Sequence, residues 1–410
     1  MSSGQMPSDY DIVIVGAGIA GSSAAITLAP RGYRILLLDE AVFPRHKCCG
    51  EGVMPQGVAI LEELGLLPET LSRGGARFRG IRLRSLEGVA AEADFPPDEG
   101  NPCLGVAMRR FELDHLLLQR AKTFPNVTVR EGFRVAGVLL AGQTVEGVEG
   151  YPANGVGRRE VFRSPLIIAA DGRSSVFHTG CGISKVYLPR KRFGVTGHLS
   201  GLEGVGAYVE VLMQPHGEIY LAPCREGLSL VALLLEKEAV RSFRGDLTSA
   251  YSSFLKSAPG FGKRMRKAEL IPPVLMAGPL GFAVEPCYGS GLLLVGDSAG
   301  FLDPITGEGM ALTLKSVRAA VPVIDEAFAA GNFGAGFLQR YAEERSRLVE
   351  DLFRFTRLVL TVSKHKPVVN RAIRRLSRDR ALFRKLLGVV TGANRYSEIN
   401  LWDKCSLLLG

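Results

Sequence analysis

The sequence predicts an α/β protein in which a parallel sheet is interrupted by a mainly antiparallel β region and followed by a helical tail. Three observations support this prediction. An apolar strand, a glycine-rich turn and an alanine-rich helix follow one another over residues 11–29. Residues 78–95 alternate apolar and polar side chains, and residues 193–235 are rich in short strands. A strand, a turn and a helical pattern then return at residues 291–315.

The first motif is GAGIAG at residues 16–21, directly after the first strand. In a Rossmann-type unit Gly16 permits a tight turn, Gly18 lets the backbone approach a pyrophosphate, and Gly21 lets helix and strand pack closely. A second strand ends at Asp39, which is placed to bind a ribose hydroxyl pair. Strand, helix and acid together favour dinucleotide binding over a glycine-rich turn of another α/β fold.

The second motif is Gly296-Asp297, which follows an apolar strand at residues 291–295 and precedes a helical pattern from Met310. A carboxylate at a strand end can accept hydrogen bonds from a polyol. Backbone N–H groups at a helix start can meet a phosphate or an electron-rich ring edge. Together with the first motif, this segment indicates a flavin enzyme.

Between the two motifs, the remaining elements follow from local patterns. Helices are expected at residues 56–66, 110–121 and 240–265. Antiparallel strands are expected at residues 127–130 and 134–162, and a buried strand is expected at residues 166–170, ending in Asp171-Gly172. Residues 335–410 form a basic helical tail, and residues 1–8 are expected to be a disordered leader.

Composition limits the partners and the location. The chain has 410 residues and 46% hydrophobic residues, but no apolar run approaches the roughly 20 residues of a spanning helix. Its seven cysteines lack metal-ligand spacing, so no metal is predicted and a reducing cytoplasm is expected. The net charge of +9 is compatible with nucleic acid, anionic membrane or anionic cofactors, but no nucleic-acid module is visible.

The chain resembles the p-hydroxybenzoate hydroxylase-like FAD superfamily and, within it, the geranylgeranyl reductase branch. The resemblance rests on the two motifs above, on Asp171-Gly172, on Arg110 four residues before Asp114, and on residues 43–52, which are similar to the family's PRxKxCG segment. It implies FAD as the cofactor and NAD(P)H as the electron donor. It also implies that Asp297 binds the ribitol chain and that residues 304–309 pass beside the isoalloxazine ring.

The resemblance and the motifs together give the following expected organisation. The FAD-binding domain is discontinuous (residues 9–75, 100–180 and 280–334), the substrate-binding domain comprises residues 76–99 and 181–279, and residues 335–410 form the C-terminal helical region. The expected cofactor-binding residues are Gly16, Gly18, Ile19, Ala20, Gly21, Asp39, Glu40, Arg45, Cys49, Gly50, Arg110, Asp171, Gly172, Gly296, Asp297, Pro304, Gly307, Glu308, Gly309 and Met310.

Two departures from the family bear on the substrate. Prenyl reductases of this branch carry an aromatic–x–Trp–x–aromatic–Pro motif, but here Glu218 replaces the first aromatic residue and Tyr220 replaces the tryptophan. Flavin halogenases carry a Trp-x-Trp-x-Ile-Pro segment, whereas Trp402 is the single tryptophan of this chain. A third departure, Phe177 in place of an arginine that helps hydroxylases with NADPH, bears on the electron donor.

Three functions follow from this pattern. The first expectation is an NAD(P)H- and O2-dependent monooxygenase that hydroxylates a lipophilic aromatic or polyketide- or isoprenoid-like molecule, because no acid–base constellation is visible and this reaction needs only a dry cavity. The alternative is a geranylgeranyl reductase-like enzyme that saturates C=C bonds of a polyprenyl chain. The third, a flavin-binding protein without turnover, is disfavoured by the intact segment at residues 304–309.

Two residues are candidates for a catalytic role. Cys49, or its neighbour Cys48, would be redox-active beside the flavin, or else a small thiol packing a tight turn. Tyr220 is expected to line the substrate cavity, because its amphipathic ring suits a mixed polar and apolar pocket.

Other titratable residues are left with open roles. Glu51 is a general acid near the ring, or it caps a helix, or it pairs with Lys47 or Arg45. His198 and His216 show no partner in the sequence, so neither is assigned a function. The cations of the helical tail suit either an anionic membrane surface, a carrier protein or a solvated helix face. The protein is therefore expected in the cytoplasm, with peripheral membrane contact as an option.

Overall fold

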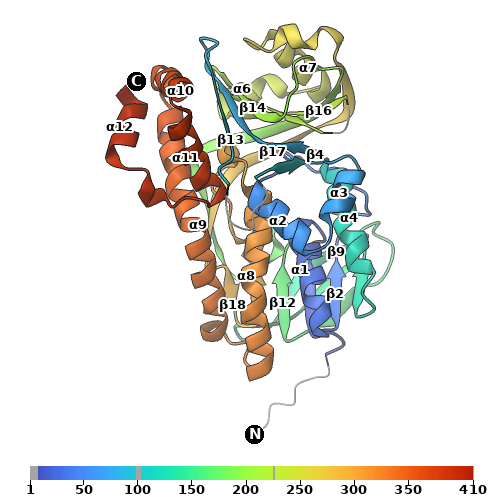
Figure 1. Ribbon diagram of the computed structural model, residues 1–410. Coiled ribbons are helices and arrows are strands. Elements are labelled where there is room, and N and C mark those ends of the chain that lie inside the picture. Colours follow the sequence, from blue (N-terminus) through green and yellow to red (C-terminus); the bar gives the residue numbers. More distant parts are fainter. Residues whose placement is uncertain (1–7, 98–102, 225–226, 410) are drawn as a thin grey trace.

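The computed structural model describes residues 8–97, 103–224 and 227–409, and its centre is a six-stranded sheet (Figure 1). Across the sheet the strands are β18 (Tyr288–Gly289), β19 (Leu292–Leu294), β12 (Leu166–Ala169), β1 (Ile12–Val15), β2 (Ile35–Leu38) and β8 (Val127–Arg130). All neighbours are parallel except β18 with β19. The carboxyl ends of β1, β2, β12 and β19 therefore lie at one edge, where ligands of open α/β sheets bind.

Several helices and a small sheet pack around this centre. Helix α1 (Ile19–Leu28) contacts both α4 (Arg110–Lys122) and α8 (Gly309–Ala330). A three-stranded antiparallel sheet of β9 (Phe133–Ala141), β10 (Thr144–Pro152) and β11 (Glu160–Arg163) contacts β2 and β12. The central strands are buried along their whole length, as expected of a parallel sheet covered on both faces.

A second large sheet forms the upper part of the molecule in Figure 1. Its order is β17 (Glu269–Glu285), β13 (Ser184–Ser200), β16 (Leu228–Glu236), β15 (Gly217–Pro223), β14 (Tyr208–Gln214), β5 (Gly80–Arg84) and β6 (Ala90–Asp94). All neighbours are antiparallel except β14 with β5. Helices α6 (Lys237–Val240) and α7 (Leu247–Ser257) adjoin it, and α7 covers one of its apolar faces.

Short elements connect the two parts. A small sheet of β3 (Gly52–Val53), β7 (Gly105–Ala107) and β4 (Ala76–Phe78) lies between them, next to α2 (Pro55–Glu63). Helix α3 (Leu67–Ser72) follows α2 in the chain, and helix α5 (Val176–Gly180) follows β12. The 17-residue strands β13 and β17 reach from the large sheet toward the central one.

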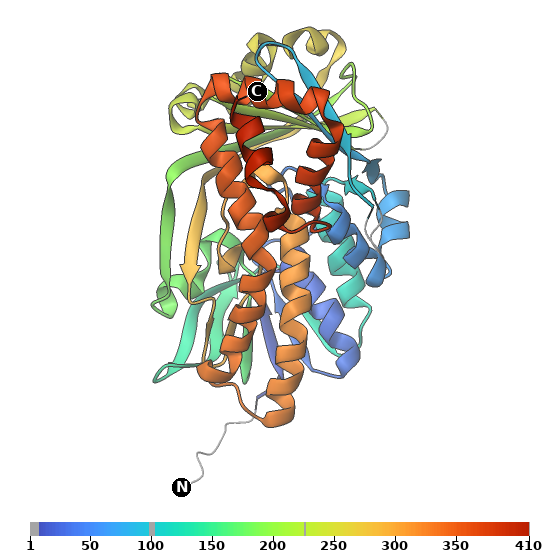
Figure 2. The same cartoon turned by 60° about the vertical axis from the view of Figure 1, so that its left-hand side comes forward.

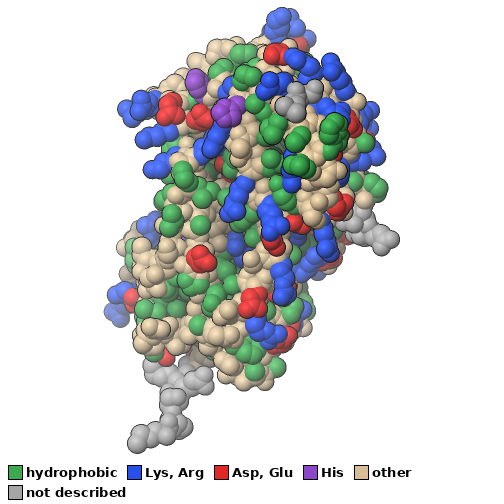
Figure 3. All heavy atoms as spheres, turned by 90° about the vertical axis from the view of Figure 1, so that its left-hand side faces the viewer, with side chains coloured by type: hydrophobic (Ala, Val, Ile, Leu, Met, Phe, Trp, Pro, Cys, Tyr) green, Lys and Arg blue, Asp and Glu red, His purple; other side chains and the backbone are tan. Residues whose placement is uncertain are grey.

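The C-terminal part is helical and lies along one side of the molecule (Figure 2). It comprises α9 (Ala335–Ser363), α10 (Lys366–Arg378), α11 (Arg380–Thr391) and α12 (Leu401–Leu409). Helix α9 packs on α8, whereas α10 and α11 pack on β6. This side of the molecule displays both cationic and hydrophobic side chains (Figure 3). Within the described residues, no helix is long and apolar enough to cross a membrane.

The predicted fold class is confirmed: a parallel sheet of the Rossmann type, an antiparallel β region and C-terminal helices are all present. The expected helix at residues 240–265 is in fact α7 with a short 3-10 helix on each side of it. Residues 127–130 form β8, which pairs with β2 in parallel and not in the expected antiparallel way, because the chain crosses back through α4 before it. The domain boundaries drawn from the sequence stay a prediction. The expected leader lies outside the described residues except for Ser8.

Candidate functional site

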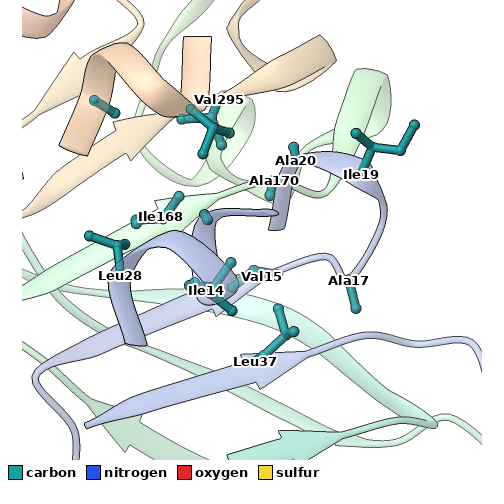
Figure 4. Packing of buried hydrophobic residues seen from close by; sticks show 14 of the residues in the cluster. Ile14, Val15, Ala17, Ile19, Ala20, Leu28, Leu37, Ile168, Ala170 and Val295 are labelled. Carbon is teal, nitrogen blue, oxygen red and sulfur yellow. The ribbon is translucent and has the colours of Figure 1, made fainter. Parts of the chain in front are cut away.

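The turn between β1 and α1 approaches the end of β12 so closely that only glycine fits. Gly16 has a φ of +100°, and a Cβ there would lie 2.4 Å from the carbonyl oxygen of Ala170. A Cβ at Gly21 would lie 1.8 Å from the carbonyl oxygen of Gly16. Figure 4 shows this region, with Ala20 on α1 and with Ala170 and Val295, which directly follow β12 and β19. Both glycines therefore have the structural roles that the sequence predicts.

Positive charge gathers beside the middle glycine of the turn. A Cβ at Gly18 would lie 3.3 Å from a guanidinium nitrogen of Arg45 and 3.9 Å from one of Arg110. Arg110 donates to the buried carboxylate of Asp114 at 2.7 and 2.8 Å, and Arg45 lies 3.1 Å from the same carboxylate. Lys47 is near them. Its side chain is exposed, but the surrounding cavity wall partly desolvates its ammonium group, and together with Arg110 this lowers the pKa of Lys47. Three cations that share one carboxylate suit an anionic pyrophosphate.

Asp39 is held by the glycine turn itself. Its carboxylate accepts hydrogen bonds from the backbone N–H groups of Ala17 at 2.7 Å and Ala41 at 2.8 Å. Burial raises the pKa of Asp39, and these two N–H groups oppose that rise. Glu40, also expected to bind the cofactor, instead forms an exposed ion pair with Arg134 at 3.0 Å. The prediction for Glu40 thus finds no support in the geometry, because its carboxylate is already paired at the surface.

The Gly-Asp segment continues β19 as a short 3-10 helix, η5 (Gly296–Ala299). Gly296 has a φ of +64°, which a residue with a side chain rarely adopts. The Ser298 hydroxyl donates to the carbonyl oxygen of Ala169 at 2.6 Å, which ties the segment to β12. Asp297 lines the cavity and stabilises the charged form of Lys47. Its position on the cavity wall suits the predicted contact with a polyol.

The following segment leads into the long helix α8. In η6 (Pro304–Thr306), the Asp303 carboxylate accepts the backbone N–H of Ile305 at 2.9 Å. Helix α8 then begins at Gly309, with Gly307 at a φ of +73° in the turn before it. The N-terminal end of this 22-residue helix therefore lies at the cavity wall. The helix dipole there favours negative charge, as on a reduced flavin ring.

Two expected residues lie behind the cavity wall. Glu308 is buried, and burial raises its pKa to about 8 although Lys315 opposes the rise. Asp171 accepts the backbone N–H of Val176 at 3.0 Å, and burial raises its pKa to about 6. Neither side chain belongs to the wall, whereas Gly172 does. Glu308 and Asp171 are therefore placed to support the wall.

The cavity has a volume of about 420 Å³ and two chemically different ends. Expected residues that line its polar end are Gly18, Ile19, Ala20, Cys49, Gly50, Arg110, Gly172, Asp297, Pro304, Gly307, Gly309 and Met310. The other end, called here the apolar arm, runs between the large sheet and the C-terminal helices. Its walls include Leu83, Met213 and Ala232 from the sheet and Phe355, Leu376 and Leu407 from α9, α10 and α12. The tail is thus part of the cavity wall.

Tyr220 lies on this wall, as the sequence predicts. Its hydroxyl donates to the carbonyl oxygen of Ile305 at 3.2 Å, and burial raises its pKa well above the usual range. Glu218, two residues earlier, forms an ion pair with Arg192, which is fully buried and also lies 3.1 Å from Asp303. The strand that departs from the prenyl reductase motif therefore binds the segment at residues 303–306 through polar contacts.

The two adjacent cysteines face different surroundings. The Cys48 thiol lies 3.5 Å from the carbonyl oxygen of Gly194 and 3.8 Å from that of Leu275, and burial raises its pKa to about 11. The sulfur of Cys49 accepts the backbone N–H of Glu51 at 3.4 Å. Both cysteines line the cavity. A packing role is visible for each, and a redox role stays a prediction.

Glu51 has partners that the sequence did not indicate. One carboxylate oxygen accepts the backbone N–H of Arg110 at 2.9 Å, so Glu51 does cap a helix, namely α4. The other oxygen lies 2.7 Å from Nε2 of His198, and not against Lys47 or Arg45 as expected. His198 was left without a role because its partner lies 147 residues away in the chain. No local pattern could have revealed this pair.

Comparison with known proteins agrees with this geometry. The family model described as FAD binding domain matches residues 9–242. A menaquinone reductase of Mycobacterium tuberculosis (strain ATCC 25618 / H37Rv) is 29% identical over 349 residues, which cover 80% of this chain and 81% of that protein. A digeranylgeranylglycerophospholipid reductase of Thermoplasma volcanium is 27% identical and covers 87% of both chains.

Among solved structures, the flavin-dependent brominase Bmp2 superposes with a TM-score of 0.79 at 19% identity over 93% of both chains. The myxobacterial chondrochloren halogenase CndH also superposes with a TM-score of 0.79, at 21% identity over 98% of this chain and 97% of that chain. At these identities the likeness shows the fold alone.

The residues present fit FAD. The cationic cradle at Gly18 suits the pyrophosphate, Asp39 lies at the ribose position of a Rossmann-type turn, and Asp297 lines the wall between that cradle and α8. The N-terminal end of α8 suits the ring edge that becomes negative on reduction. The individual binding roles stay predictions.

We predict that Asp297→Ala weakens FAD binding by roughly 1–3 kcal/mol, the usual size of a charge-assisted hydrogen bond to a buried partner. Equilibrium titration of the FAD-free protein, followed by quenching of flavin fluorescence, measures the effect. Glu40→Ala is the matched control, because Glu40 is paired at the surface and should bind FAD like the wild type. Unchanged affinity in Asp297→Ala would contradict the assignment.

Proposed function

Because this chain belongs to the FAD binding domain family, we propose that this flavin-dependent oxidoreductase saturates a carbon–carbon double bond in the isoprenoid chain of a lipid. The observation that carries the proposal is the apolar arm, which continues directly from the polar end of the cavity. A flavin bound at the polar end would thus have a long hydrophobic chain beside it.

The walls of the apolar arm match such a chain. The residues that α10, α11 and α12 contribute are all apolar, among them Ile373, Leu386 and Leu407. An isoprenoid chain has no hydrogen-bonding groups, so burying it against these side chains leaves no polar group unpaired. A small aromatic substrate for hydroxylation would instead need a few placed polar groups to fix its orientation. The apolar arm therefore favours reduction of the substrate. Hydroxylation, the first expectation from the sequence, is less well supported by it.

The relatives support the same choice. Two proteins that match over about four fifths or more of this chain are named as reductases of a menaquinone and of a digeranylgeranyl glycerophospholipid. Both names denote lipids with isoprenoid chains. The structural likeness to halogenases concerns the fold alone, and this chain has a single tryptophan, far from the position of the halogenase motif.

The residues would act by binding, orienting and excluding water. FAD, when bound in its reduced form, supplies a hydride. The cations around Gly18 would hold its pyrophosphate, and the N-terminal end of α8 would stabilise negative charge on its ring. Tyr220 fixes the segment at residues 304–306 by its bond to Ile305, and the apolar arm keeps the reacting chain dry. NAD(P)H as the electron donor is part of this proposal.

We expect the protein to reduce an isoprenoid double bond without oxygen. Protein reduced anaerobically with NADH, NADPH or dithionite should regain the absorbance of oxidised flavin when a geranylgeranylated phospholipid is added. Mass spectrometry should find a product heavier by one pair of hydrogen atoms. The phospholipid is a cleaner acceptor than menaquinone, because a quinone ring can itself be reduced. Hydroxylated product formed only with oxygen would instead support the monooxygenase interpretation.

A change inside the apolar arm should affect long substrates selectively. Ala372 on α10 lines the arm, and Ala372→Phe should fill part of it. We expect KM for a geranylgeranyl chain to rise by about tenfold or more, since even one methylene that does not fit a hydrophobic pocket costs about 1–3 kcal/mol. Flavin reduction by the electron donor should not change. Ala381→Phe, at an exposed position of α11, is the control. Equal KM values for both variants would show that the chain does not bind in this arm.

We also propose that an anionic membrane delivers the substrate to this face. On α12, which packs on α10, Leu401 and Trp402 are 76% and 75% exposed, and Leu408 is 42% exposed. On α10, Arg371 and Arg378 are exposed and lie one heptad apart on one face. Exposed apolar and cationic side chains over the end of the apolar arm suit an interfacial membrane contact.

Vesicles with anionic lipid should therefore bind the protein at low salt and release it at high salt, because each cation contributes about 1 kcal/mol that salt screens. Leu401→Ser with Trp402→Ser should weaken the binding, as measured by sedimentation, and leave the flavin spectrum unchanged. Val156→Ser, at an apolar position that is also 76% exposed, is the control. Equal sedimentation with anionic and neutral vesicles would point to a carrier protein or a purely structural tail.

A further inference from the structure

Reduction of a carbon–carbon double bond needs a proton as well as a hydride. An inference about the source of this proton rests on the proposed function. The hydride forms one C–H bond, and the electron pair of the π bond then forms the second C–H bond with a proton. The apolar arm is lined by hydrophobic side chains, so the proton has to come from a group of the cavity wall. Few side chains of the cavity wall carry a proton that can be transferred.

Several of these groups are poorly suited as the donor. Burial raises the pKa of Cys48 to about 11, and its thiol lies against backbone carbonyl oxygens. The Tyr220 hydroxyl already donates to Ile305, and burial raises its pKa further. Lys47 and Asp297 belong to the part of the wall that suits the pyrophosphate and the ribitol chain. Arg110 and Arg173 also line the wall, but a guanidinium group does not give up its proton. Among the acidic side chains of the wall, Glu51 and Cys49 remain.

Glu51 has an unusual backbone and a fixed side chain. It lines the cavity and is 3% exposed. Its φ of +57° makes it the one non-glycine residue with a positive φ in the described part of the chain. Such a conformation is costly and persists where the surroundings fix it, which is frequent at functional sites. Here the Arg110 N–H and the His198 ring hold the two carboxylate oxygens.

His198 connects Glu51 to a second site for a proton. The imidazole is buried on β13, its Nε2 lies 2.7 Å from Glu51, and its Nδ1 has no hydrogen-bond partner among the described residues. A buried polar atom without a partner is rare, and a catalytic role is one reason for it. Each carboxyl oxygen has two lone pairs, so the contacts of Glu51 still leave room for a proton. Cys49 interacts instead with the Arg110 guanidinium group, which does not give up a proton.

We propose that Glu51 is the proton donor of the reduction and that His198 is the buried group that returns the proton to it. The O–H bond of the Glu51 carboxyl breaks as the C–H bond forms at the substrate carbon that does not receive the hydride. When the product leaves the cavity, the free Nδ1 of the neutral His198 ring takes a proton from water, and the hydroxide passes to the solvent. The imidazolium formed in this way gives its Nε2 proton to the Glu51 carboxylate, which restores the Glu51 carboxyl group and the neutral imidazole.

Other charged or titratable groups surround the pair and would influence its titration. Cys224, at the end of β15, lies 3.9 Å from the Glu51 carboxylate through its sulfur. The charges of His46 and Arg109 also act on this cluster, and Cys48 and Cys49 adjoin it. Glu51, His198 and Cys224 place their donor atoms within 4.8 Å of one another. Cys224 thus contacts the Glu51 carboxylate, whereas Glu51 and His198 contact each other directly. A change at Cys224 therefore serves as a control for changes at the Glu51–His198 pair.

The test separates proton transfer from hydride supply and from folding. Glu51→Gln keeps the acceptor for the Arg110 N–H, so we expect normal FAD affinity, thermal stability and flavin reduction by dithionite. Anaerobic reoxidation of the reduced flavin by a geranylgeranylated phospholipid should slow at least a hundredfold, the size typical of general acid catalysis. His198→Gln should slow it about tenfold or more. Cys224→Ser should react like the wild type.

A second readout does not depend on turnover. NMR of the imidazole nitrogens, with His198 assigned among the six histidines by His198→Gln, should show a titration that shifts when Glu51 becomes Gln. Reoxidation of Glu51→Gln within about threefold of the wild-type rate would overturn the role of Glu51 as donor. If the wild type reduces no isoprenoid lipid, the proposed function fails instead. An unchanged His198 titration in Glu51→Gln would then refute the coupled pair as well.

Discussion

The structure depends on the contact between the glycine turn after β1 and the end of β12. At Gly16 a Cβ would lie 2.4 Å from the Ala170 carbonyl oxygen, so the turn can close only without a side chain. This approach brings the ends of β1, β12 and β19 to one edge, together with the start of α8. Asp39, Gly172 and Asp297 reach the same region from different strands because parallel strands end on the same side.

The second constraint joins this edge to the large sheet. Strands β13 and β17 are long enough to reach it, and β13 carries both Arg192 and His198. Arg192 holds Asp303 next to the start of η6, whereas His198 holds Glu51 before β3. Both contacts are buried, so losing one partner would leave a buried polar group without its hydrogen bond. They fix the two sides of the polar end of the cavity relative to each other.

The C-terminal helices complete the cavity. Without α10, α11 and α12, the face of the large sheet formed by β5, β14, β15 and β16 would expose its apolar residues to water. These helices place hydrophobic side chains toward the sheet and cations outward, which explains how a basic tail can form an apolar wall. Several of these cations also pair with acids of the main body, as Arg374 does with Glu87. The tail is thus part of the folded core and not an appendage.

The sequence by itself determined the elements whose cause is local. Glycine spacing, strand ends and helical periodicity were sufficient to predict the turn at residues 16–21 and the start of α8. They also placed Asp39 and Asp297 directly after strands. Only the tertiary structure decided that Glu51 meets His198, that Arg192 joins Glu218 to Asp303, and that the tail lines the cavity. The physical reason is that backbone conformation and periodicity act over a few residues, whereas these contacts join segments far apart in the chain. Such contacts form only when whole sheets and helices pack together.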